Sequence, residues 1–95
     1  MRVKKYELQA ESFLEEGTTS ETLFTGLAAE VGEVMSERVK ETRKGYRHSD
    51  EIFDELSDVL WYVTMIARSR GYTLNRLMKH NINKLEDRSI NGKGN

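Results

Sequence analysis

The spacing of glycines and turn-forming residues constrains the fold of this proline-free chain more than any other feature. The breaks fall at Gly17 to Ser20, at Gly45 to Asp50 and at Gly71 to Thr73. Because no proline interrupts the stretches between these breaks, each stretch can run as one helix. Ser20 and Thr73 are expected to be the N-caps of the second and fourth stretches. We predict helices over Lys4 to Glu16, Ser20 to Arg43, Ser49 or Asp50 to Arg70, and Thr73 to Arg88.

The short connections between these helices favour antiparallel neighbours, so the predicted fold class is all-α, an antiparallel four-helix bundle. We expect one domain over residues 1–88. The tail, residues 89–95, has nothing to bury and is predicted to be disordered. A chain of 95 residues without cysteine buries a modest core, and we therefore expect a homo-oligomer.

The charge balance argues against a general nucleic-acid binder, since 15 Lys and Arg residues oppose 16 Asp and Glu residues. The longest apolar stretch, Val59 to Ala67, is too short and too polar to cross a bilayer. The first residues, MRVKKYELQAE, lack the apolar core of a signal peptide. We expect a cytoplasmic protein without membrane or nucleic-acid partners. Five cations are interpreted as a solvated helix end: Arg38, Lys40, Arg43, Lys44 and Arg47.

Acidic residues border the apolar face of the second and third predicted helices in the same way. At about 100° per residue, Glu30, Glu33 and Glu37 form a stripe along one edge of the apolar arc of the second helix. Glu55, Asp58 and Tyr62 line the corresponding edge of the third helix. If the two helices pack antiparallel through their apolar arcs, both edges come to the same side of the pair.

Carboxylates gathered at a half-buried edge repel one another unless a cation neutralises them. Magnesium prefers oxygen ligands and is often shared with substrate phosphates, which suits a site without histidine or thiol. Either pair alone is typical of a solvated helix face. Two pairs at the same offset from the core predict a metal site formed by Glu30, Glu33, Glu55 and Asp58.

Helix four carries an amide within its apolar row, which Leu74, Leu77, Met78 and Leu85 would form. Asn81 lies on that row, and Lys84 and Arg88 flank it. Two interpretations are open: a buried amide that fixes register beside two cations reaching water, or a set of contacts to a phosphate near the metal.

These motifs resemble those of the all-alpha nucleotide pyrophosphohydrolase superfamily, whose MazG-like members carry an ExxE helix followed by an ExxD helix. The matching stretches are LAAEVGEV, residues 27–34, and DELSDVLWYV, residues 54–63. The segment NINKL, residues 81–85, is similar to the family's closing helix. The likeness covers roughly residues 23–88.

The resemblance implies that Glu30, Glu33, Glu55 and Asp58 are catalytic magnesium ligands, with Mn²⁺ able to substitute for Mg²⁺. It also implies nucleotide contacts from Tyr62, Asn81, Lys84 and Arg88. Many members have a further acid just before the ExxE motif, where this chain has Ala29. The water-activating role would fall to one of the four acids or would be assisted by Glu37. Family members are commonly dimers or tetramers whose sites draw on neighbouring subunits.

The implied reaction is hydrolysis of a nucleoside triphosphate, with a deoxynucleotide favoured, to the monophosphate and pyrophosphate. Among the bases, a purine such as that of dGTP is the one we favour. Other open interpretations are hydrolysis of phosphoribosyl-ATP or an alarmone, and a non-enzymatic helical module that binds a partner protein.

Several further residues have two interpretations each. Trp61 lies off the main apolar arc, so it packs against helix one or a second subunit, or it stacks on a base. Tyr6, Gln9 and Phe13 are candidates to wall a base pocket, although Tyr6 and Phe13 fit the core better. We expect two surface histidines, His48 and His80, because neither has a partner at metal-ligand spacing.

Overall fold

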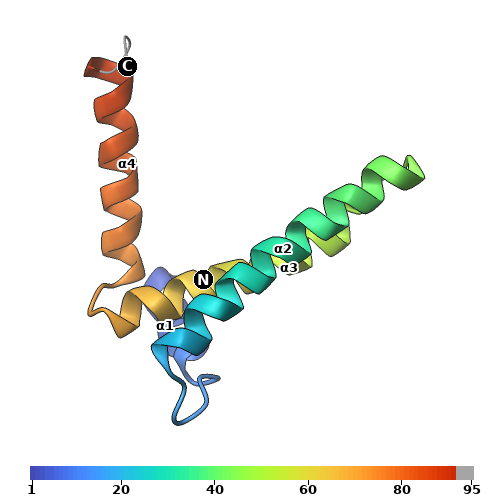
Figure 1. The fold of residues 1–95 in the computed structure, drawn as a ribbon. Helices are drawn as coiled ribbons and strands as arrows, with labels where there is room; N and C mark the ends of the chain where they lie inside the picture. Colours follow the sequence, from blue (N-terminus) through green and yellow to red (C-terminus); the bar gives the residue numbers. More distant parts are fainter. Residues whose placement is uncertain (92–95) are drawn as a thin grey trace.

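The computed structural model describes residues 1–91, which form four helices joined by short turns (Figure 1). This part of the chain contains no strand, as the all-helical prediction requires. The helices are α1 (Val3–Glu11), α2 (Ser20–Lys44), α3 (Ser49–Ser69) and α4 (Leu74–Asn91).

The ends of α2 follow the local chemistry of its sequence. Thr19, one residue before the predicted Ser20, is the N-cap: its Oγ1 accepts the Thr22 N–H at 3.2 Å. At the other end Gly45 adopts a left-handed conformation with φ of 74° and donates its N–H to the Glu41 carbonyl at 2.9 Å. Glycine is favoured there because it has no Cβ to oppose a positive φ.

Helix α1 is shorter than predicted, since it ends at Glu11 rather than Glu16. The chain leaves the helix through a tighter turn, in which the Ser12 N–H donates to the Gln9 carbonyl at 3.1 Å and the Phe13 N–H to the Ala10 carbonyl at 3.2 Å. One consequence corrects the sequence analysis. Phe13, predicted for the core, is 77% exposed beyond the end of α1.

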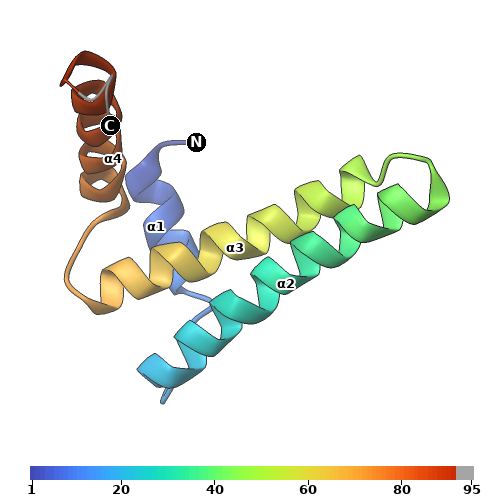
Figure 2. The same cartoon turned by 45° about the horizontal axis from the view of Figure 1, so that its top comes forward.

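The centre of the molecule is the antiparallel pair formed by α2 and α3, which lie side by side along their whole length (Figure 2). A small core forms where α1 crosses this pair, from Ala10, Leu23 and Met65. Trp61 packs against it and donates its indole N–H to the Ala10 carbonyl at 3.0 Å. Of the alternatives for Trp61, contact with helix one is therefore the one observed.

Helix α4 stands away from the α2–α3 pair in both views (Figures 1 and 2). Among the described residues it contacts α1 and α3 but not α2, so one chain does not close the predicted four-helix bundle. Its start is anchored by the buried Glu7, whose Oε1 accepts the Leu74 N–H at 2.7 Å and lies 3.3 Å from the Arg68 guanidinium. Thr73 is the N-cap predicted, since its Oγ1 accepts the Arg76 N–H.

Much apolar surface stays exposed on this single chain. Leu77, Met78 and Leu85, predicted to face inward from α4, are all exposed, as are residues of the arcs on α2 and α3 such as Met35 and Leu56. The accessible surface is 7554 Å², roughly 1,900 Å² more than a compact monomer of this mass exposes. The radius of gyration is 16.2 Å, against about 12 Å for a compact domain of this length.

Helix α4 continues to Asn91, so it includes the first three residues of the segment predicted to be disordered. Residues 92–95, the rest of that segment, lie outside the described residues.

Candidate active site

The antiparallel packing of α2 and α3 brings acidic residues from both helices together. One carboxylate oxygen from each of Glu30, Glu55 and Asp58 lies within 4.8 Å of the other two. Glu33, one turn along α2 from Glu30, is exposed and lies outside this group, although its charge acts on Glu55. The sequence predicts that four acids converge. The structure brings three of them together, and Glu33 lies beside these three.

The electrostatics of this acidic cluster (Glu30, Glu33, Glu55 and Asp58) favour an added cation. Burial raises the pKa of Glu55, and the neighbouring carboxylates of Glu30, Glu33 and Asp58 raise this pKa further. Glu30 Oε2 is buried and has no hydrogen-bond partner among the described residues. A buried oxygen in that state is costly unless something positive meets it. The all-carboxylate donor set fits a hard divalent cation such as Mg²⁺.

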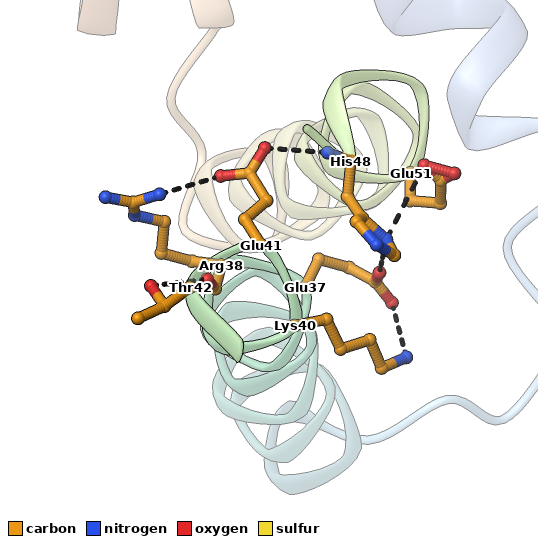
Figure 3. A network of polar contacts seen from close by, with 7 residues as sticks. All are labelled: Glu37, Arg38, Lys40, Glu41, Thr42, His48 and Glu51. Carbon is orange, nitrogen blue, oxygen red and sulfur yellow. Dashed lines mark hydrogen bonds and ion pairs between the residues drawn. The ribbon is translucent and has the colours of Figure 1, made fainter. Parts of the chain in front are cut away.

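Glu37 lies on the acidic stripe of α2 but belongs to a different set of contacts (Figure 3). Lys40 Nζ lies 3.1 Å from its Oε2, and His48 Nδ1 lies 3.3 Å from its Oε1. Lys40, and then His48, lower the pKa of Glu37 against the opposing effect of burial. A carboxylate held in this way is not available to assist the acidic cluster.

Tyr62 lies across Gly26, so closely that a Cβ at position 26 would fall on its ring. Glycine in the middle of a helix costs about 1 kcal/mol relative to alanine, and here it allows the ring to lie against the α2 backbone. Both residues line a surface hollow of about 390 Å³ that includes Ala29, the neighbour of Glu30. Gly26 is not among the residues predicted for the site, although a glycine inside a helical pattern is a signal for close packing.

A second hollow, of about 210 Å³, adjoins the first because Tyr62 lines both. Three aromatic rings line it, and hydroxyl groups and an acid complete its wall. The lining residues are Phe13, Glu15, Thr18, Thr22, Leu23, Trp61 and Tyr62. Phe13, predicted for the core or a base pocket, therefore lines a surface hollow, whereas Gln9 does not line it.

The three α4 residues assigned to substrate contact are not brought to the acidic cluster within one chain. Asn81, Lys84 and Arg88 are all exposed on the projecting helix. The interpretation of Asn81 as a buried amide is therefore wrong for the single chain. His80 is exposed as predicted, whereas His48, also predicted to lie at the surface, is buried.

The fold and the site together define a class of protein: an α-helical domain with a carboxylate cluster that suits a divalent cation. The chain belongs to the MazG nucleotide pyrophosphohydrolase family, because a family model of the MazG nucleotide pyrophosphohydrolase domain matches residues 18–92. Gene 37 protein of Mycobacterium phage L5 is 32% identical over 72 residues, which cover 70% of this chain and 63% of that protein. The chain thus spans less than two thirds of this relative's length. No solved structure gives a significant match.

No helix within residues 1–91 combines the length and the apolar character that crossing a membrane requires.

Proposed function

We propose that this chain hydrolyses a nucleoside triphosphate, with deoxynucleotides favoured, to the monophosphate and pyrophosphate, using Mg²⁺ held by the acidic cluster. The observation that carries the proposal is the meeting of Glu30, Glu55 and Asp58 around a buried oxygen without a hydrogen-bond partner. Family membership supports the reaction class. The catalytic domain spans residues 1–88, and Mn²⁺ is expected to replace Mg²⁺.

The cation, when bound, would neutralise phosphate charge and lower the pKa of a bound water. Glu30, Glu55 and Asp58 hold the cation, and the exposed Glu33 completes the set by a side-chain movement. Because position 29 is alanine and Glu37 is engaged by Lys40 and His48, the proton of the attacking water is accepted by one of the four acids.

The two hollows support an assignment for the rest of the nucleotide. Glu30 and Thr22 are eight residues apart on α2, which is about 12 Å along the helix axis. We assign the hollow beside Gly26 and Tyr62 to the sugar, and the aromatic hollow beyond it to the base. Aromatic rings offer flat faces on which a base stacks. The Trp61 indole N–H is already bonded to the Ala10 carbonyl, so this residue contributes ring surface rather than a hydrogen bond.

A second copy of the chain would complete the site. The roughly 1,900 Å² of excess surface per chain matches what stable homodimers bury. Docking of the apolar face of α4 onto a neighbour would remove the exposed Leu77, Met78 and Leu85 from water. In a dimer or tetramer of this kind, Asn81, Lys84 and Arg88 reach the phosphates of a site on another subunit.

The test is a Mg²⁺-dependent screen of all canonical and several modified nucleotides, with pyrophosphate and orthophosphate measured separately. We expect pyrophosphate from a triphosphate substrate. Glu55→Gln and Asp58→Asn should abolish its release while circular dichroism remains that of a helical fold. Asp54→Asn, an exposed acid of α3 outside the cluster, is the matched control and should stay active. Full activity in either cluster variant would rule out the proposed site.

A further inference from the structure

A second group of polar side chains joins the end of α2 to the start of α3 at the tip of the α2–α3 hairpin (Figure 3). His48 directly precedes α3, and its backbone N–H donates to Glu41 Oε2 of α2 at 2.8 Å. Tyr46 stacks on the imidazole with ring centroids 4.7 Å apart. The backbone bond and the stacked ring hold the imidazole in place without using either ring nitrogen.

Both ring nitrogens of His48 are buried and form no hydrogen bond with the described residues. The residue is only 8% exposed. Nδ1 lies 3.3 Å from Glu37 Oε1 and 3.8 Å from Glu51 Oε1, and neither approach has hydrogen-bond geometry. Nδ1 thus has two carboxylates at ion-pair distance but no hydrogen bond. Buried nitrogens without a hydrogen bond are rare and costly, and a bound ion is one of the standard reasons for them.

We propose that His48, Glu37 and Glu51 bind a divalent transition cation of the Zn²⁺ type at the hairpin tip. Imidazole is a good ligand for Zn²⁺ and a poor one for Mg²⁺, so the tip favours Zn²⁺ over Mg²⁺. With ligand bonds of about 2.0–2.2 Å, the ligand atoms of a tetrahedral zinc site lie about 3.4 Å apart. The separation of His48 Nδ1 from Glu37 Oε1, 3.3 Å, already has this value.

Binding requires one side chain to move. Among the described residues, Glu30, Glu55 and Asp58 are the one set whose three ligand atoms, one from each residue, already lie within 4.8 Å of one another. The ligand atoms of His48, Glu37 and Glu51 must therefore come closer together. The Glu51 side chain is 52% exposed, so it can turn inward and shorten its 3.8 Å separation from Nδ1. Lys40 remains on the other oxygen of Glu37, Oε2, and a water takes the fourth position of the cation.

The cation would tie the end of α2 to the start of α3. Glu37 follows Glu33 by four residues and Glu51 precedes Glu55 by four, so the two carboxylate ligands lie about one turn from the acidic cluster, on the side of the hairpin tip. The site therefore stabilises the hairpin beside the acidic cluster without taking part in its chemistry. It does not depend on the proposed activity.

The experiment adds Zn²⁺ to the full chain in excess Mg²⁺, which competes with Zn²⁺ for the acidic cluster. Histidine ring signals are followed by NMR and binding by calorimetry. The chain has two histidines, so His80 is an internal control. We expect one Zn²⁺ per chain and a shift of the His48 signals only. His48→Gln should abolish binding, Glu51→Gln should weaken it at least tenfold, and His80→Gln should leave it unchanged.

Three results would overturn the proposal: unmoved His48 signals at one equivalent of Zn²⁺, undiminished binding in His48→Gln, or wild-type affinity in Glu51→Gln. If His48→Gln does not fold, the NMR titration of the wild type and Glu51→Gln, whose changed side chain is half exposed, still decide the question.

Discussion

Replacement of Gly26 by alanine tests the contact that positions Tyr62. A methyl group at position 26 would fall on the Tyr62 ring, so the ring must leave the α2 backbone. Overpacking of this kind costs about 1–3 kcal/mol, while alanine stabilises the middle of a helix by about 1 kcal/mol relative to glycine. We therefore expect Gly26→Ala to lower the free energy of unfolding by about 0–2 kcal/mol.

A double-mutant cycle separates these two effects. In a Tyr62→Ala background the clash is gone, and Gly26→Ala should then stabilise the chain by about 1 kcal/mol. The sign change corresponds to a coupling energy of about 1–3 kcal/mol between the two positions. Gly32→Ala is the matched control, since a Cβ there meets nothing within 4 Å, and it should stabilise the wild type.

The assay is urea unfolding followed by circular dichroism at one fixed protein concentration, because association shifts apparent stability. Gly26→Ala should also raise KM more than it lowers kcat if Tyr62 contacts the nucleotide. If Gly26→Ala stabilises the wild-type chain as much as Gly32→Ala does, Tyr62 is not held against the α2 backbone.

Three other predictions concern pH, the anchor of α4 and association. The raised pKa of Glu55 means that the metal-free native chain holds a proton that the unfolded chain has lost, so stability should fall as pH rises from 4.5 to the raised pKa. Urea unfolding should show that Glu55→Gln removes this fall in stability. The lowered pKa values of Glu37 and Glu41 change the stability only below pH 4.5, so they do not interfere. Glu7→Gln weakens charge-assisted bonds to Arg68 and the α4 N-terminus and should cost about 1–3 kcal/mol in the same assay. Leu85→Glu should reduce the mass measured by light scattering to that of the monomer, with an unchanged mass as the contrary result.

The sequence was sufficient to predict the helices and the meeting of acids because both follow from local periodicity. Glycines and hydroxyl residues mark the ends of α2 and α3 to within about a residue, in agreement with Gly45 and Thr19. The offset of Glu30 from the apolar arc of α2 matches that of Glu55 on α3. Antiparallel packing then brings the two together.

What the sequence did not predict depends on contacts distant in the chain. The direction of α4 is set by the carboxylate of Glu7, 67 residues before Leu74, and periodicity carries no information on such a pair. The burial of His48 depends on Glu37, Glu41 and Tyr46 enclosing one turn. Helix α1 ends early at a turn in which the Ser12 N–H and hydroxyl both donate to the Gln9 carbonyl, and helical periodicity does not reveal this turn.

The most direct test of the central claim is a calorimetric titration with Mg²⁺ of the wild-type chain, Glu30→Gln and Asp54→Asn. Glu30 carries the buried oxygen without a hydrogen-bond partner, and Asp54 is an exposed acid on α3. We expect stoichiometric binding to the wild type and to Asp54→Asn, and at least about tenfold weaker binding to Glu30→Gln. No stoichiometric binding to the wild type, as a purely protein-binding module predicts, or equal binding to all three chains, would contradict the claim.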